Sequence, residues 1–291
     1  MRVLTLNIWA RSGPYEVREP LLRHELGLLA PEVAALQEVD AGREGGEAGD
    51  QATELLGPLG YQVAYERRTG DYRAGPGLAV ASRVPILGRE LIELPHGGAA
   101  LAVRLDAGGE GFWFCNAVPM RPWPGQEGQR EAEVVALDAA LTALADGDTR
   151  PPVLAGDFDA TPDAASIRFL TGLQSLHGHD TAWYDAWAVA GDGSPGHTWS
   201  SDSPYVAPFA AAVFAQPVHH RRIDYVFVGS PFRWRPRVVV RSCEVVCRGT
   251  ADAAPSDHWG VFADLDLDGV SLGGGRGLET WSDVESSLWR R

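Results

Sequence analysis

Carboxylate and amide side chains follow short apolar runs at five places along this sequence. They are Asn7, Glu38, the pair Asp157 and Asp159, Asp224, and Asp257 with His258 next to it. Oxygen ligands of this kind suit a hard cation such as Mg²⁺, which needs only one or two protein carboxylates, and an imidazole beside carboxylates can serve as a general base. Each position alone is more simply explained by a turn residue, a helix cap or an exposed acid. The prediction of a metal-dependent site therefore depends on their joint occurrence.

The apolar runs predict the elements that must position these groups. Strands are expected at residues 3–9, 33–39, 61–65, 78–82, 86–94, 100–105, 112–118, 152–155, 223–228, 238–246 and 259–265, and helices at 19–29, 50–56, 127–144 and 164–170. Pro20 is expected in the first turn of its helix, where proline is tolerated. Residues 172–220 are expected to be mostly irregular. Strands that recur throughout, with helices between some of them, favour two sheets packed face to face in one domain with helices outside.

Composition limits the classes of function that the chain can perform. It has 291 residues, a formal net charge of −14 and three cysteines without a disulfide-framework spacing. A chain this acidic should repel polyanions at long range, and tight non-specific duplex binding normally needs many Lys and Arg contacts to phosphate. There is no signal-peptide pattern, and no apolar run approaches the about 20 residues that a bilayer span requires. We expect a cytoplasmic, monomeric protein without a membrane span.

The polar motifs, in their order along the chain, resemble the signatures of the endonuclease/exonuclease/phosphatase superfamily, which includes deoxyribonuclease I. The matching segments are Leu6-Asn7-Ile8-Trp9, Gln37-Glu38, Gly156-Asp157-Phe158-Asp159-Ala160-Thr161-Pro162, Ile223-Asp224-Tyr225 and Ser256-Asp257-His258. The third and fifth are the most specific. Because five motifs occur in register from residue 6 to residue 258, chance resemblance is a poor explanation.

This resemblance implies a fold and a set of roles. The fold would be a four-layer α/β sandwich of two packed, mainly antiparallel sheets flanked by helices, over residues 1–267, with 268–291 as a tail or extension. Glu38 would bind Mg²⁺ or Mn²⁺, with Asn7 and Asp257 close by. His258, oriented by Asp224, would be the general base or a phosphate contact, and Asp157 would orient the attacking water.

Two positions depart from the family pattern. Asp159 stands where the family usually has Asn; an ionised Asp cannot donate a hydrogen bond to phosphate, although it could bind a metal or a second cation. Val118 stands where a second histidine usually contacts the phosphate. We expect that Arg121, His219 or His220 supplies the missing positive contact, the alternative being that the last two lie in a solvated loop.

Two further residues are weaker candidates for substrate contacts. Tyr72 lies in a segment where the family often has a loop tyrosine near the phosphate, although an exposed turn is the simpler reading. Trp199 lies where family members carry a substrate loop, and it could stack on a base, sugar or lipid headgroup or pack against the sandwich.

Together these features predict a divalent-metal-dependent phosphoesterase that hydrolyses a phosphodiester or phosphomonoester by in-line attack of water. The net charge favours a small or non-polymeric substrate. Two alternatives remain open. One is a metal-dependent nuclease, and the other is a catalytically impaired member of the superfamily that binds a phosphorylated ligand or a protein.

Overall fold

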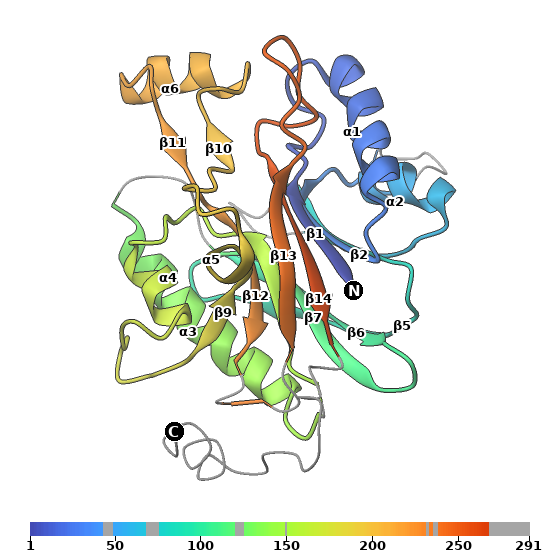
Figure 1. Ribbon diagram of the computed structural model, residues 1–291, viewed down its shortest axis with the longest axis vertical. Helices are drawn as coiled ribbons and strands as arrows, with labels where there is room; N and C mark the ends of the chain where they lie inside the picture. Colours follow the sequence, from blue (N-terminus) through green and yellow to red (C-terminus); the bar gives the residue numbers. More distant parts are fainter. Residues whose placement is uncertain are drawn as a thin grey trace, which may run out of the picture.

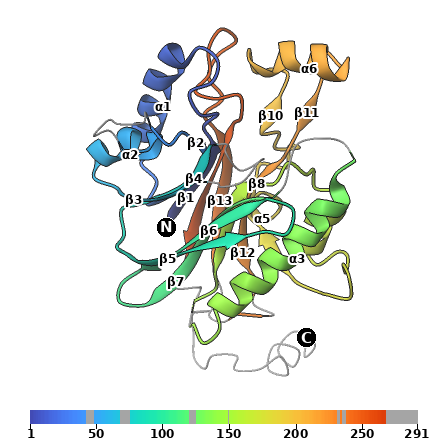
Figure 2. The same ribbon diagram turned by 180° about the vertical axis from the view of Figure 1, so that it is seen from behind.

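Two six-stranded sheets pack face to face in the computed structural model, which describes residues 1–42, 49–67, 76–119, 125–148, 150–230, 233–234 and 238–267 (Figures 1 and 2). The first sheet has the order β13 (Val239–Val246), β14 (Gly260–Asp266), β1 (Arg2–Asn7), β2 (Val33–Val39), β4 (Gly77–Ser82) and β3 (Gln62–Glu66). The second has the order β5 (Ile86–Glu93), β6 (Ala99–Asp106), β7 (Gly111–Val118), β8 (Val153–Asp157), β12 (Asp224–Gly229) and β9 (Trp183–Asp185).

Each sheet is mixed. One parallel pair lies in each, β1 with β2 and β7 with β8, and the other neighbouring strands are antiparallel. The inner faces of both sheets form one apolar core, which includes Val3, Val80, Phe114 and Val226. The predicted sandwich of two mainly antiparallel sheets is confirmed.

Helices cover the two outer faces and complete the four layers. On the first sheet, α1 (Tyr15–Leu29), α2 (Gln51–Leu56) and the 3-10 turn η1 (Gly57–Leu59) lie over an apolar cluster that includes Leu22 and Leu55. On the second sheet, α3 (Glu127–Leu144) and α4 (Ala165–Leu170) bury Val134, Leu137 and Ile167. A short helix, α5 (Ala186–Ala190), follows β9.

The α1 helix starts earlier than predicted. It begins at Tyr15 rather than at residue 19, so Pro20 lies inside the helix instead of in its first turn. Proline at this position removes only one backbone hydrogen bond of the helix. The prediction assumed that proline occurs only in the first turn, so it placed the start of the helix too late. The extra turn brings Arg18 into the helix and under the site.

Residues 172–220 are irregular over most of their length, as predicted, but they also contain elements that were not predicted. This region contains β9, α5 and an arm that consists of β10 (Trp199–Ser200), β11 (His220–Arg221) and, between them, α6 (Val206–Phe214). The arm projects beyond the end of the sandwich, beside the long loop that leads to β14 (Figure 1). Strands of two residues carry no alternation, and α6 has no polar residue to reveal a helical period. The sequence of the arm therefore shows neither the alternation that predicts a strand nor the period that predicts a helix.

None of the helices in the described ranges is long and apolar enough to cross a membrane.

Candidate active site

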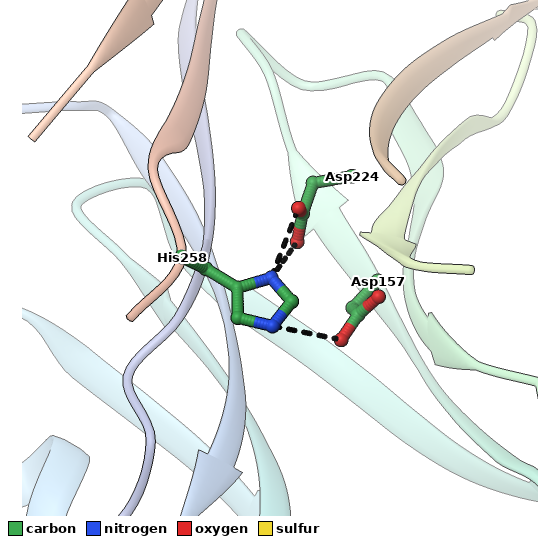
Figure 3. A group of neighbouring side chains, drawn as sticks. All are labelled: Asp157, Asp224 and His258. Atoms are coloured by element: carbon green, nitrogen blue, oxygen red, sulfur yellow. Dashed lines mark hydrogen bonds and ion pairs between the residues drawn. The ribbon is translucent and has the colours of Figure 1, made fainter. Parts of the chain in front are cut away.

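A buried histidine and aspartate form the centre of the site. Asp224 opens β12, and both of its carboxylate oxygens lie within hydrogen-bond distance of His258 Nδ1, at 3.2 and 3.1 Å (Figure 3). The backbone N–H groups of Ile223 and Asp224 donate to the Thr198 hydroxyl oxygen, which fixes the start of β12. Burial raises the pKa of Asp224 to about 6, against the lowering effect of His258. The carboxylate orients the imidazole through Nδ1, so the neutral form of the ring carries its proton there and Nε2 is its basic nitrogen.

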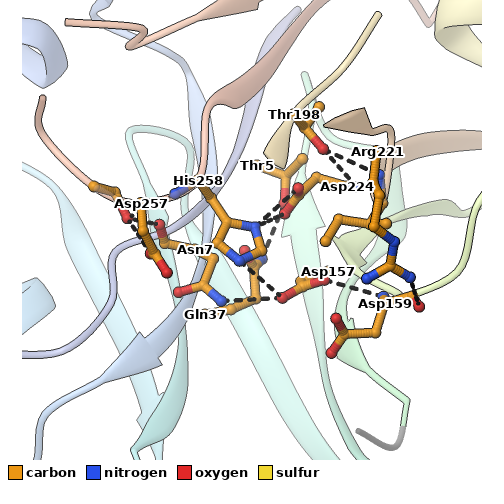
Figure 4. Close-up of polar contacts among 12 residues, drawn as sticks. Thr5, Asn7, Gln37, Asp157, Asp159, Thr198, Arg221, Asp224, Asp257 and His258 are labelled. Atoms are coloured by element: carbon orange, nitrogen blue, oxygen red, sulfur yellow. Dashed lines mark hydrogen bonds and ion pairs between the residues drawn. The ribbon is translucent and has the colours of Figure 1, made fainter. Parts of the chain in front are cut away.

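The other ring nitrogen faces a second aspartate. His258 Nε2 lies 3.9 Å from Asp157 Oδ2, and the same oxygen accepts a 3.0 Å hydrogen bond from Asn7 Nδ2 (Figure 4). Asp157 stands directly opposite Asp224 in the register of β8 and β12. Burial alone would lower the pKa of His258, but Asp224 and Asp157 together hold this pKa well above its ordinary value.

Asp157, Asp224 and His258 are close enough to hold a metal ion together. One ligand atom from each lies within 4.8 Å of the others, and all three residues are buried. The group is therefore consistent with a metal site, although His258 Nδ1 is already engaged by Asp224.

Two more carboxylates complete an acidic cluster at the same end of the sandwich. Glu38 has a positive φ of 53°, at the point where the pairing of β2 with β4 becomes irregular. Burial and the neighbouring Asp257 raise the pKa of Glu38 to about 7, and burial also raises the pKa of Asp257. The Asn7 amide donates to Asp157, and its proximity to Glu38 partly offsets the raised pKa of that residue. A crowded set of oxygen donors that is hard to ionise fits a divalent cation, which would compensate the charge.

A cavity of about 250 Å³ opens over these groups. Glu38, Asp157, Asp159, Asp257 and His258 line one side of it. The rest of the lining comes from the first loop, from the arm and from the residue before β12: Trp9, Trp199, Tyr205, Val206, Phe209, Phe214, Arg221 and Ile223. The catalytic-type groups thus share one cavity with a largely apolar set of side chains.

A family comparison by sequence agrees with this geometry. The model of the Endonuclease/Exonuclease/phosphatase family matches residues 4–258. The chain belongs to the endonuclease/exonuclease/phosphatase family. This is a family of metal-dependent phosphoesterases, and the matched range contains every buried acid of the site.

Solved structures show the family fold over nearly the whole chain. The human Nocturnin catalytic domain with bound sulfate has a TM-score of 0.68 at 21% identity, with 92% of this chain and 93% of that chain covered. D. rerio TDP2 complexed with a single-strand DNA product has a TM-score of 0.68 at 18% identity, with 91% and 98% covered. An endonuclease/exonuclease/phosphatase from Bacteroides vulgatus has a TM-score of 0.67 at 20% identity, with 91% and 98% covered. None of the curated proteins matches by sequence.

Most residues predicted from the family motifs come together in the cavity. Asn7, Asp224 and the five acidic and histidine residues of the lining form one polar cluster, and Trp199 also lines the cavity. His219 and His220 are not among the described lining residues. His219 packs against Phe214 and Trp199, and His220 hydrogen-bonds Ser200. Arg121 and Tyr72 lie outside the described residues, as does the predicted tail 268–291.

The two departures from the family pattern have distinct surroundings. Val118 is 9% exposed and belongs to the apolar core between the sheets, so packing replaces a polar contact there. Asp159 has a positive φ of 49° and is buried beside Asp157, which raises its pKa well above the ordinary value, burial being the larger cause. Arg221 Nη2 donates to the Asp159 carbonyl at 2.6 Å. Arg221 therefore brings a positive charge to the cavity from the segment in which His219 and His220 were predicted to do so.

Two sets of buried side chains support the site and were not predicted from the sequence. The Gln37 amide donates to Asn116 and to Thr5, and the Asn116 amide donates to the carbonyls of Leu36 and Ala79. This network joins β1, β2 and β4 of the first sheet to β7 of the second. Figure 4 shows Gln37 and Thr5 close to the polar cluster. Gln37 and Asn116 lie inside apolar runs of the sequence. This position could have indicated a buried network, because a buried amide must find hydrogen-bond partners.

Arg18 is the second missed support. Its side chain is fully buried, and it donates to the carbonyls of Ser12, Ile8, Trp9, Ala10 and Pro255. It therefore ties the loop after β1 to the loop that carries Asp257 and His258. In the sequence it reads as one more charged residue at the start of a helix.

Proposed function

We propose that this protein hydrolyses phosphoesters, with phosphodiesters as the main class, by in-line attack of a water molecule that His258 activates. The observation that carries the proposal is the position of His258. Asp224 holds it through Nδ1, while Nε2 points toward Asp157 at the acidic side of the cavity. Asp224 fixes the tautomer in which Nε2 is the accepting nitrogen, and a divalent cation in the acidic cluster would lower the raised pKa of His258, so that the neutral base is available.

Glu38 and Asp257, with Asn7 beside them, are the residues that would hold Mg²⁺ or Mn²⁺. When bound, such an ion supplies Lewis-acid stabilisation of charge on the phosphoryl oxygens. The alternative ligand group of Asp157, Asp224 and His258 would leave no free imidazole for the water. We therefore assign the metal to the Glu38 side of the cluster and the proton transfer to the His258 side.

The reaction follows from these assignments. Asp157, held by Asn7, orients a water beside His258 Nε2, and the imidazole takes its proton while the oxygen attacks phosphorus. The ester oxygen on the opposite side leaves as an alcohol after protonation from solvent, and no covalent intermediate with the protein forms. Arg221 lines the cavity, so its charge can face a phosphoryl oxygen. It would supply the positive contact that Val118, in place of the family's second histidine, cannot make.

The substrate is proposed to be small or non-polymeric. The net charge of −14 opposes the approach of a long polyanion. The lining of the cavity in the described ranges has Arg221 as its single arginine or lysine, whereas duplex binding rests on many such contacts.

A panel of phosphodiesters and phosphomonoesters, assayed with Mg²⁺ or Mn²⁺, tests the proposal. We expect metal-dependent turnover of at least one diester, stopped by chelator, and a loss of about 100-fold or more in kcat for His258→Ala. His24→Ala is the matched control, because His24 is exposed on α1. If no member is turned over in a metal- and His258-dependent way, the proposal is wrong and binding without turnover becomes the better explanation.

A further inference from the structure

One part of the cavity lining, called here the apolar wall, is largely aromatic. Trp9, Trp199, Tyr205, Val206, Phe209 and Phe214 contribute to it. All but Trp9 belong to the arm formed by β10, α6 and β11 or to the loop just before α6. The lining of one small cavity therefore combines two kinds of group, carboxylates with an imidazole and an arginine, and aromatic rings.

The apolar wall is fixed relative to the catalytic histidine. Trp199 and His258 form an antiparallel β-bridge, and the Trp259 N–H donates to the Thr198 carbonyl at 2.6 Å. The indole of Trp199 also packs edge-on against Phe209 and Phe214, with ring centroids 6.1 and 6.2 Å apart. Because the arm is joined to the segment that carries His258, a group held by the wall is positioned relative to Nε2.

This wall is not fully covered by the part of the chain that the structure describes. Phe209 lines the cavity, yet it is 43% exposed. The sequence from Ser203 to Val218 contains no charged residue. Exposed aromatic surface at the mouth of a cavity gains free energy when a ligand removes it from water. A charged group placed there would instead lose hydration without a partner.

We propose that the substrate carries a compact, uncharged apolar group, about the size of one aromatic ring, on the phosphorus centre, and that the arm binds this group. The inference rests on the proposed function for the place of the phosphate, over His258 and beside Arg221. A volume of about 250 Å³ accommodates one phosphate and one ring. Edge-to-face packing among Trp199, Phe209 and Phe214 is the arrangement that a further ring can join.

Binding of three alkyl and aryl phosphonates separates this inference from catalysis. Methylphosphonate, phenylphosphonate and octylphosphonate share the anion and differ in the apolar group, and they are not hydrolysed. With Mg²⁺ present and affinities measured by calorimetry, we expect phenylphosphonate to bind the wild-type protein at least about 10-fold more tightly than methylphosphonate. Phe209→Ala should reduce this preference to about 3-fold or less, while leaving the affinity for methylphosphonate unchanged.

The matched control is Val213→Ala. Val213 lies on the same helix and is 47% exposed, but it is not among the residues that line the cavity. This variant should keep the full preference for phenylphosphonate. Unchanged binding of methylphosphonate in both variants shows that they are folded and that the anion site is intact.

Three results would overturn the inference. One is equal affinity of the wild-type protein for methylphosphonate and phenylphosphonate. Another is a preference that survives both Phe209→Ala and Phe214→Ala. The third is octylphosphonate binding more than 10-fold more tightly than phenylphosphonate and losing this advantage in Val213→Ala, because a long chain would then lie on the outer face of α6.

A negative hydrolysis panel beside an intact phenyl preference would reject the proposed reaction and support the apolar site. Turnover without a preference would do the reverse.

Discussion

At the scale of single residues, the site depends on two aspartates that the sheet places face to face. Asp157 and Asp224 are opposite partners on neighbouring antiparallel strands. Like charges in this position destabilise a sheet, and here both residues are also buried. His258 lies between them and gains from both, which raises its pKa despite its burial. The arrangement is costly for the fold, so its presence is best explained by the chemistry of the imidazole.

Replacement of Asp224 by asparagine tests the role of this carboxylate. Asp224→Asn keeps the shape but removes the charge that stabilises the protonated imidazole, and the amide no longer fixes the proton on Nδ1. We expect the pKa of His258 to fall and kcat to decrease by about 10²–10⁴-fold. The pH dependence of kcat/KM and an NMR titration of the histidines measure the two effects.

Asp202→Asn is the control for that change. Asp202 also lies near a histidine, with 3.9 Å between its Oδ2 and His220 Nδ1. Neither residue is among the described residues that line the cavity. Activity should stay within about 2-fold of wild type. Should Asp224→Asn have no larger effect than Asp202→Asn, the oriented-imidazole mechanism is wrong.

At the scale of elements, Arg18 of α1 keeps two site loops in place. Its guanidinium donates to carbonyls on the loop after β1 and to Pro255, next to Ser256. The Ser256 hydroxyl in turn donates to the Asn7 carbonyl at 2.7 Å. The segment that leads to Asp257 and His258 is therefore held to β1 from two sides.

Arg18→Met should consequently destabilise the protein and disturb the site. Methionine fills a similar volume but leaves several buried carbonyls without donors, so we expect a loss of about 3–5 kcal/mol in the free energy of unfolding. Denaturant unfolding measures it. Arg23→Met on the same helix removes an exposed pair with Glu19 and should cost less than about 1 kcal/mol. Equal losses in the two variants would contradict a special role for Arg18.

The elements also show why some features could be predicted from sequence and others could not. The strands that carry Asn7, Glu38 and Asp157 are runs of buried residues, so their positions follow from apolar patterning. The arm was missed because its strands pair over two residues each and its helix lacks polar residues. It could not be predicted either that the positively charged side chain at the cavity is Arg221 rather than His219 or His220. Neighbouring residues of a strand point to opposite faces, and a one-residue shift in register exchanges them.

At the scale of the whole molecule, the acidic cluster makes stability depend on pH. Burial and Asp257 raise the pKa of Glu38 from an ordinary 4.5 to about 7. Between these values the folded protein holds a proton that the unfolded chain has released, so the free energy of unfolding falls as pH rises across this window. The raised pKa values of Asp224, to about 6, and of His258 act in the same direction. Without a cation, the protein should be less stable at pH 8 than at pH 5.

Divalent cations should reverse this loss. A metal that binds the ionised cluster binds the folded state alone and competes with protons, so its stabilising effect grows with pH. In thermal unfolding of chelator-treated protein, we expect saturating Mg²⁺ to raise Tm by about 5 °C at pH 8 and by about 1 °C or less at pH 5. Glu38→Gln should unfold at a higher Tm than wild type in chelator at pH 8 and should respond less to Mg²⁺. Glu90→Gln, an exposed change on β5, should behave as wild type. A Mg²⁺ response that is the same at both pH values, or that Glu38→Gln retains in full, would place the cation elsewhere than beside Glu38.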